Sequence, residues 1–257
     1  MAIELYNDGK HICLMFDDLA DDDNNHAVQA NQFLIVDNGH GALIDPGGNM
    51  TYNGLLMGMQ EYFSSKRLDF LFASHADPDI IASANKWMIH SQCKVAISAL
   101  WARFVPHFCT AGNTEGRIIG IPDQGMSFQL GECSIKAVPA HFMHSEGNFQ
   151  FYDPISKILF SGDMGASIVS HTEADTPVED FNAHIKHMEG FHRRYMISNK
   201  ICRYWVNMVR QMDVESIVPQ HGKPFRGKKM VNQFLDWIEA LPCGIDIVTQ
   251  DLYRMPA

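Results

Sequence analysis

Histidine and aspartate side chains follow an apolar segment of this chain at a spacing that suits a metal centre. His75, Asp77 and Asp79 alternate directly after the apolar run LDFLFAS, and Pro78 restricts the backbone between them. A turn at this point can direct three such side chains towards one ion, because imidazole nitrogen and carboxylate oxygen are common metal ligands. This segment is the first candidate for chemistry.

Three further apolar segments end in polar residues of the same kind. VPAH ends at His141, ILFSGD ends at Asp163, and SIVPQHG contains His221. Proteins of the α/β class build binding sites where strands end, because rigid strands position loops that are free to diverge. A single His or Asp there is commonly a helix cap or a satisfied core residue. Four strand ends that together supply three histidines and three aspartates instead favour a shared metal site.

The donor types indicate which metals would suit this site. A mixture of imidazoles and carboxylates is harder than an all-imidazole site, so it suits iron or manganese at least as well as zinc. Three carboxylates offset three of the four charges on two divalent ions, which leaves such a site able to take up a further anion.

Short strands and helices must position these side chains. Strands are predicted within 9–16, 30–45, 68–75, 94–99, 117–122, 127–141, 148–163 and 216–221, and helices after residue 51, within 178–212 and within 228–241. The turn dipeptides Asp8-Gly9 and Asn38-Gly39 predict hairpins in the first third. Without repeats or a linker, the order predicts an α/β (α+β) protein in which helices flank two sheets, with residues 1–257 as a single domain.

The composition excludes several classes of protein. Of 257 residues 46% are hydrophobic and the net charge is −10, which argues against disorder and against binding to phosphate backbones or anionic lipids. No apolar run reaches the roughly 20 residues that cross a bilayer, and no signal peptide begins the chain. The six cysteines form no CxxC pair, which argues against an iron–sulfur cluster or a Cys-rich zinc site. We expect a cytoplasmic protein that binds neither nucleic acid nor membrane.

The order of these motifs resembles the metallo-β-lactamase fold. HxDxD, a later His, SGD and PQHG follow one another as in that fold, and LIDPGG at 43–48 is similar to its early strand and turn. The resemblance covers most of the chain and implies a four-layer αββα sandwich. Hydrolases of the fold carry HxHxDH, whereas Asp77 places a carboxylate at the second ligand position. This is similar to the HxExDH of flavo-diiron proteins, and KILFSGD and RRY at 193–195 also resemble segments of that branch.

The resemblance implies a ligand set for two iron ions. It assigns His75, Asp77 and His141 to one iron, Asp79 and His221 to the other, and Asp163 to a bridge between them. Ile80 stands where the family motif has its last His. Two interpretations follow: the Ile80 side chain packs in the core and a water replaces the imidazole, or the second iron has an open position suited to a gas, which we prefer.

Other residues are alternatives or supporting candidates. Alignment back from KILFSGD favours His144 as the ligand, but we prefer His141 because it follows the strand directly, which leaves His144 as a supporting or substitute ligand. Tyr195 matches a tyrosine of the flavo-diiron branch and would donate its hydroxyl to a bound oxygen species, or else is a core tyrosine. His26 is a weaker candidate. We expect three further histidines to lie on a helix surface: His184, His187 and His192.

HADPD followed by Ile and later by HFMHSEGNF resembles the stand-alone oxygen-binding diiron proteins associated with bacterial chemotaxis receptors. This resemblance implies a non-haem diiron centre that takes dioxygen or a peroxo ligand and acts as an oxygen sensor in chemotaxis signalling. It also implies a receptor or kinase as partner, and a homodimer is an option because flavo-diiron relatives pair head to tail.

Two other functions compete with sensing. One is an oxygen or nitric oxide reductase. No Gly-rich phosphate loop occurs in the sequence, so we expect neither a flavodoxin domain nor a flavin in this chain. Such a reductase would therefore need an external electron donor. The other is a binuclear metal-dependent hydrolase, which would contain zinc and a metal-bound hydroxide. Asp77 argues against the hydrolase.

Overall fold

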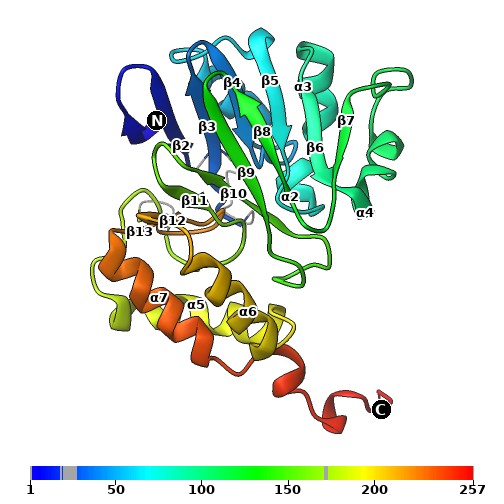
Figure 1. The fold of residues 1–257 in the computed structure, drawn as a ribbon. Helices are drawn as coiled ribbons and strands as arrows, with labels where there is room; N and C mark the ends of the chain where they lie inside the picture. The colour runs from blue at the N-terminus through cyan, green and yellow to red at the C-terminus, as the bar shows by residue number, and fades with distance from the viewer. Residues whose placement is uncertain (1, 18, 20–27, 171–172, 257) are drawn as a thin grey trace.

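Two β-sheets lie face to face in this protein, and helices cover the outer face of each sheet (Figure 1). The computed structural model describes residues 2–17, 19, 28–170 and 173–256. The four-layer αββα sandwich predicted from the sequence is confirmed.

The first sheet holds seven strands in the order β1-β2-β3-β4-β5-β6-β7. Strands β1 to β4 each pair antiparallel with the next, and tight turns join β1 to β2 and β3 to β4. Strands β4 to β7 pair parallel because helices connect them. The strands are β1 Ala2–Asn7, β2 His11–Phe16, β3 Gln32–Asp37, β4 His40–Ile44, β5 Leu68–Phe72, β6 Lys94–Ser98 and β7 Ile118–Ile121.

Both predicted hairpins are present in this sheet. Asp8 and Gly9 lie between β1 and β2, and Asn38 and Gly39 lie between β3 and β4. Asn38 has φ of 47° and Gly39 has φ of 82°. Positive φ at both central residues is what a two-residue type I′ hairpin turn needs, which explains the Asn-Gly pair.

The second sheet holds six strands in the order β13-β12-β11-β10-β9-β8. Only β11 and β12 pair parallel in it, since helices carry the chain from one to the other. The strands are β8 Met126–Leu130, β9 Cys133–Pro139, β10 Phe149–Asp153, β11 Ile158–Phe160, β12 Ser216–Val218 and β13 Phe225–Arg226.

The helices divide between the two outer faces. Residues of α1 to α4 pack on the first sheet, and α5 to α7 lie together on the second (Figure 1). The helices are α1 Tyr52–Met59, α2 Pro78–Ile81, α3 Ala84–His90, α4 Ala99–Ala102, α5 Phe181–Tyr195, α6 Asn199–Val209 and α7 Lys228–Ala240, with 3₁₀ turns η1 Ser65–Arg67, η2 Val105–Phe108, η3 Gly244–Asp246 and η4 Gln250–Leu252. Across the described residues, no helix combines the length and the apolarity that spanning a bilayer requires.

Strand periodicity divides the core into three layers. Along β3, Leu34 and Val36 face the helices of the first sheet, while Phe33 and Ile35 face the second sheet. Successive side chains of a strand point to opposite faces, so strands that are apolar throughout are buried on both sides. A third layer separates the second sheet from α5 to α7. The sandwich therefore holds its strand ends rigidly.

Candidate metal centre

Loops after four strands bring six titratable side chains together. The loop after β5, together with the first turn of α2, supplies three of them, and the loops after β9, β11 and β12 supply one each. The side chains are His75, Asp77, Asp79, His144, Asp163 and His221. Pro78 starts α2, a position that proline favours because its ring fixes φ for a helix. That short helix sets the directions of the aspartates on either side of Pro78.

One half of the cluster has two imidazoles facing two carboxylates. His75 Nε2 lies 3.6 Å from Asp77 Oδ2 and 3.7 Å from Asp163 Oδ2. His144 Nε2 lies 3.4 Å and 2.9 Å from the same two atoms. Single donor atoms of His75, Asp77 and His144 all lie within 4.8 Å of one another. Such a group of nitrogen and oxygen donors has the size of a metal-ion site.

The other half contains one imidazole. His221 Nε2 lies 3.3 Å from Asp79 Oδ2 and 3.6 Å from Asp163 Oδ1. Asp163 therefore presents one carboxylate oxygen to each half of the cluster. Its Oδ1 atom is buried and has no hydrogen-bond partner within the described residues. A buried carboxylate oxygen without a partner is costly unless a cation satisfies it, so the donor set fits two metal ions.

The structure places His144 rather than His141 in this cluster, which corrects our preference for His141. After β9 the chain turns, with the Met143 N–H donating to the Ala140 carbonyl and Phe142 at φ of 66°. This turn directs the His141 side chain away from the cluster and brings the His144 side chain, three positions later, into it. His141 Nε2 lies 2.8 Å from the Asp123 carbonyl oxygen instead.

Hydrogen bonds behind the cluster orient two of its imidazoles. His221 Nδ1 donates to the Gln29 carbonyl at 2.6 Å, and His75 Nδ1 lies 2.9 Å from Ser74 Oγ. Asp45 of the LIDPGG motif accepts the Ser74 N–H at 2.8 Å and so fixes the backbone before His75. A histidine held through Nδ1 presents Nε2 to a metal, and such partners tune ligand basicity.

The ionisable groups of the cluster stabilise one another's charged forms. Burial alone would lower the pKa of His144, but the carboxylates of Asp163 and Asp77 outweigh it and raise this pKa to about 10. Hydrogen bonds from His144 and His75 lower the pKa of Asp77. Burial would raise the pKa of Asp163, yet the three imidazoles hold it below its ordinary value. The carboxylates are thus ionised, and a divalent ion would compete with protons for the imidazole nitrogens.

A cavity of about 740 Å³ opens over the cluster. Asp77, Asp79, His144, Asp163 and His221 form its floor. The wall is mainly apolar and includes Ile168 and Phe191, with Arg194 and Tyr195 beside them. The cavity therefore gives a small ligand access to the donor atoms on its floor, past side chains that are mainly apolar.

The structure decides between our alternatives for Tyr195 and shows where Ile80 packs, whereas the open iron position that we prefer beside Ile80 stays a prediction. Tyr195 is 53% exposed, with its ring 5.6 Å from that of His144, so it is not a core tyrosine. Ile80 is fully buried in the core between the first sheet and its helices and does not line the cavity. The Ile80 side chain thus packs as the plainer interpretation expected, and the Asp79 half has one imidazole fewer than the other half. His26 lies outside the described residues.

Two of the three histidines that we expected on a helix surface are buried instead, which is a correction, whereas His187 is only partly buried. His184 is 6% exposed and His192 is fully buried on the inner face of α5. His192 Nε2 accepts the Gly165 N–H at 2.9 Å, so this residue supports the loop that carries Asp163. The spacing of Phe181, His184, Met188 and His192 along one helical face could have indicated it. The sequence also did not indicate Ser74 and Gln29 as hydrogen-bond partners of the cluster histidines, because backbone and hydroxyl contacts leave no sequence pattern.

The sequence matches a protein family described as "ODP family beta lactamase" over residues 28–222. The chain is 40% identical to a solved structure described as the peroxy diiron species of chemotaxis sensor ODP, with a TM-score of 0.86 and coverage of 98% of this chain and 99% of that one. It is 39% identical to the apo state of chemotaxis sensor ODP from T. denticola, with a TM-score of 0.84 and the same coverage.

More distant proteins are also similar to this chain, and one of them is a solved structure with the same fold. Rubredoxin oxygen:oxidoreductase from Desulfovibrio gigas is 15% identical, with a TM-score of 0.78 and coverage of 93% of this chain and 61% of that chain. An uncharacterized protein of Methanocaldococcus jannaschii is 24% identical over 208 residues, which is 80% of this chain. The chain spans about half the length of that curated relative, 51%.

Proposed function

Because this chain belongs to the ODP family of β-lactamase-fold proteins, we propose that it is a non-haem diiron protein that binds dioxygen and acts as an oxygen sensor in chemotaxis signalling. The observation that carries the proposal is the position of Asp163, whose two carboxylate oxygens face the two halves of one cluster of imidazoles and carboxylates. The solved relative with a peroxy diiron species supports it.

The chain's own residues would divide between the two ions. His75, Asp77 and His144 would hold one iron, Asp79 and His221 would hold the other, and Asp163 would lie between them. Two ferrous ions at this site would supply the electrons that capture of dioxygen requires. The half with one imidazole offers fewer protein donors, so we expect it to leave more room for an external ligand.

The surrounding residues would favour retention of a bound oxygen species. The mainly apolar side chains around the cavity, including Ile168 and Phe191, offer few groups that could donate a proton to a bound anion. The Tyr195 hydroxyl would donate a hydrogen bond from the cavity wall, and Arg194 adds a positive charge beside it. These groups hold a ligand rather than deliver electrons, which favours sensing over turnover. We also propose that the protein acts in the cytoplasm together with a signalling partner.

Anaerobic iron loading followed by exposure to air tests the proposal. We expect two iron ions per chain and an oxygen-dependent optical band that persists. Two zinc ions per chain and no such band would contradict the proposal and favour the hydrolase. Rapid decay of the band with many turnovers, given a reductant, would favour the oxygen or nitric oxide reductase.

The signalling role needs a separate experiment. Purified receptor and kinase proteins of the chemotaxis system would be tested for binding to the ferrous and to the air-exposed protein. We expect binding that differs between the two states, because a sensor must report its ligand through differential affinity. Equal absence of binding in both states would remove the sensing role and leave the diiron centre in place.

A further inference from the structure

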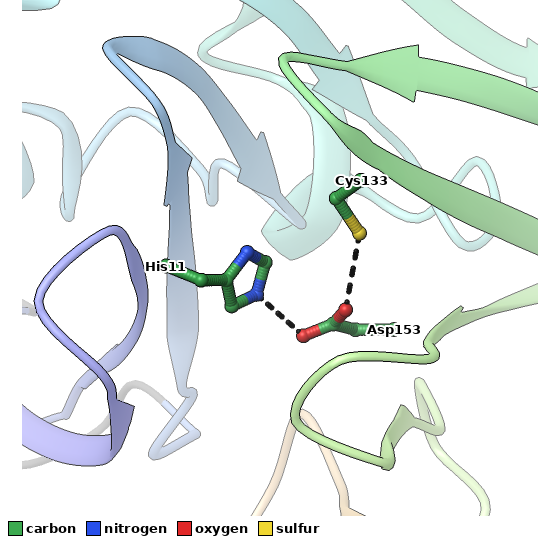
Figure 2. Close-up of side chains that lie close together, drawn as sticks. All are labelled: His11, Cys133 and Asp153. Carbon is green, nitrogen blue, oxygen red and sulfur yellow. Dashed lines mark hydrogen bonds and ion pairs between the residues drawn. The ribbon is translucent and has the colours of Figure 1, made fainter.

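A second cluster of metal-binding side chains lies inside the molecule, between the two sheets. His11 begins β2, Cys133 begins β9 and Asp153 ends β10, so the three residues come from both sheets and converge in the interior (Figure 2). Each is at most 1% exposed. None of them contributes to the centre described above.

The donor atoms of this cluster lie at distances close to those of a bound ion. His11 Nε2 lies 2.7 Å from Asp153 Oδ2, Cys133 Sγ lies 3.2 Å from Asp153 Oδ1, and all three donors lie within 4.8 Å of one another. Ligands of a tetrahedral zinc ion lie about 3.3–3.8 Å apart. The Asp153 carboxylate would need to withdraw from His11 by less than about 1 Å to admit an ion.

A neighbouring thiol can complete the set. Cys13 Sγ lies 3.5 Å from His11 Nε2 and 3.3 Å from Asp153 Oδ2, and Cys13 is fully buried. The four residues then offer one nitrogen, one oxygen and two sulfurs. Closed sites with four such donors are typical of structural zinc, whereas the centre under the cavity has no sulfur donor.

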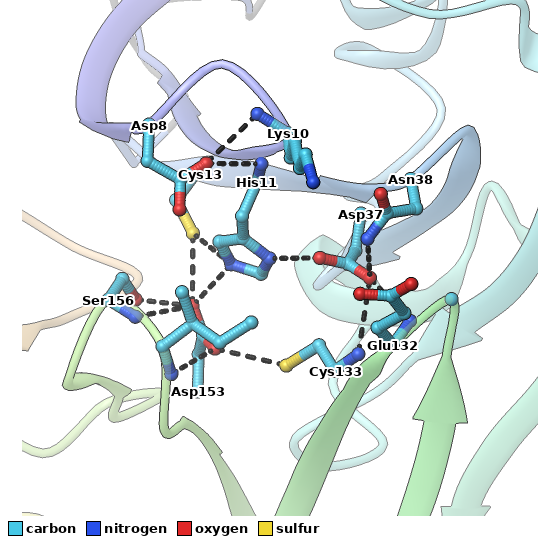
Figure 3. A network of polar contacts seen from close by, with 12 residues as sticks. Asp8, Lys10, His11, Cys13, Asp37, Asn38, Glu132, Cys133, Asp153 and Ser156 are labelled. Carbon is cyan, nitrogen blue, oxygen red and sulfur yellow. Dashed lines mark hydrogen bonds and ion pairs between the residues drawn. The ribbon is translucent and has the colours of Figure 1, made fainter.

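A second carboxylate holds His11 in the orientation that a metal ligand needs. His11 Nδ1 donates to Asp37 Oδ1 at 2.9 Å (Figure 3). Asp37 is itself fixed, because its Oδ2 accepts the backbone N–H groups of Glu132 at 2.6 Å and Cys133 at 3.1 Å. A carboxylate behind a histidine is the common outer partner of zinc-bound imidazole, and it leaves Nε2 facing the other donors.

We propose that His11, Cys133 and Asp153, completed by Cys13, form a closed third metal site that takes one zinc ion and joins the two sheets. Zinc binding would displace three protons, one from His11 Nε2 and one from each thiol, while Asp37 and Asp153 stay ionised. Without an ion the same atoms form hydrogen bonds, which keep the donors assembled.

Cobalt substitution tests the site through its sulfur ligands. Cobalt(II) bound to thiolate gives an intense near-ultraviolet charge-transfer band, and the six-residue centre contributes none because it contains no cysteine. We expect the band in cobalt-loaded protein, and its reduction to about half or its loss in Cys133→Ser, which keeps only the Cys13 thiolate. Cys93→Ser is the matched control, since Cys93 is equally buried but lies in the other core layer. Absence of the band from the unaltered protein, or its full intensity in Cys133→Ser, would overturn the proposal.

A measurement without cysteine replacement covers the case in which Cys133→Ser does not fold. Zinc-edge X-ray absorption of the zinc-loaded protein should show sulfur at about 2.3 Å. The His144→Ala variant should keep this sulfur signal, because His144 belongs to the other centre. If the diiron proposal is wrong, the sulfur signal should therefore still be present, so the two proposals can be tested separately. A spectrum with nitrogen and oxygen ligands alone would overturn the zinc site.

Discussion

At the residue scale, the proposed diiron centre depends on which histidine completes it. Asp163 is central, since its two oxygens face both halves of the cluster, and His144 is the imidazole nearest to it at 2.9 Å. His141 differs from His144 by three positions in the chain, yet its ring bonds to the Asp123 carbonyl. The two histidines therefore form a matched pair for testing the centre.

Replacement of His144 by alanine should reduce the iron content from two ions per chain towards one. The variant removes one of the imidazoles around Asp77 and Asp163, so one ion loses a ligand while the Asp79 and His221 half is intact. Loss of one protein ligand should weaken affinity at that half by at least about 100-fold. Metal analysis after dialysis against a weak chelator measures the effect.

His141→Ala is the control, and it should retain two ions per chain. The side chain makes its bond outside the cluster, so its removal changes no donor. A loss of metal in His141→Ala with normal content in His144→Ala would reverse our assignment of the ligand.

Replacement of Tyr195 by phenylalanine should leave the metal content unchanged and shorten the lifetime of the oxygen-dependent band. The exposed ring lies against His144 at the cavity wall, so the variant removes a hydroxyl donor without disturbing the core. A hydrogen bond to a charged acceptor is worth about 1.5–3 kcal/mol, which corresponds to a change in lifetime of about tenfold or more. Stopped-flow spectroscopy measures the decay, and an unchanged lifetime would exclude a role for the hydroxyl.

At the element scale, α5 supports the loop that follows β11. Asp180 caps the helix by accepting the Ala183 N–H, and its buried face carries His192 against Gly165. His192 Nδ1 donates to the Met188 carbonyl, so its Nε2 is free to accept. Burial lowers the pKa of His192 to about 4, which keeps the ring neutral and able to accept this bond near neutral pH. The helix thus fixes the loop from which Asp163 projects.

Replacement of His192 by alanine should lower the free energy of unfolding by about 2–4 kcal/mol. The variant leaves a cavity beside Trp237 and Phe234 and a buried Gly165 N–H without its acceptor. Urea unfolding at neutral pH measures the change. Iron affinity should also fall, by about tenfold, because the loop around Asp163 loses its support.

His192→Gln serves as the comparison for that variant. Its amide oxygen can accept the Gly165 N–H, so it should recover part of both losses. Recovery of stability without recovery of iron affinity would show that His192 acts on the core alone.

At the scale of the whole molecule, a buried ionic network joins the two sheets. His11 of the first sheet lies between two carboxylates, Asp37 of the same sheet and Asp153 of the second sheet, and both of its ring nitrogens are bonded (Figure 3). Asp37 ends β3 of the first sheet, so the imidazole bridges strands of both layers. Burial alone would lower the pKa of His11, but the two carboxylates outweigh it and raise this pKa. The network therefore contributes an ion pair to an otherwise apolar interior.

Replacement of Asp153 by asparagine should lower the free energy of unfolding of the metal-free protein by about 1.5–3 kcal/mol at neutral pH, because the neutral amide loses the charge-assisted hydrogen bond with His11 while Asp37 still pairs with the imidazole. Burial would raise the pKa of Asp153, but His11 and Ser156 hold it well below its ordinary value of 3.8. A lowered pKa contributes stability that is present above pH 3.8 and is lost as the pH falls further, because the unfolded chain takes up the proton first.

The difference in the free energy of unfolding between the unaltered protein and Asp153→Asn should accordingly become smaller below pH 3.8. Urea unfolding with a chelator at several pH values measures it. Asp213→Asn is the control, since Asp213 is also held at a low pKa, about 2, by Lys157 and Lys228 but is 53% exposed. Solvent screens that pair, so the control should change stability far less. If Asp153→Asn and Asp213→Asn lose the same free energy of unfolding, the buried network stabilises the fold no more than the exposed ion pairs do.

The sequence by itself determined the elements and most of the residues of the centre. Apolar runs of strand length, bounded by turn residues, predicted β5, β9, β11 and β12, and polar residues after them predicted where a site would assemble. Asn38 and Gly39 predicted a hairpin because the needed backbone angles are local. Local chemistry of this kind is readable without knowledge of distant contacts.

Only the tertiary structure decided which side chains meet. His144 replaces His141 because the path of one turn sets the direction of each ring, and periodicity carries no information about that path. His192 is buried because α5 packs against the second sheet, and His11 meets Asp153 across 142 residues because two sheets stack. Such contacts depend on register and layer packing, which arise when the whole chain folds.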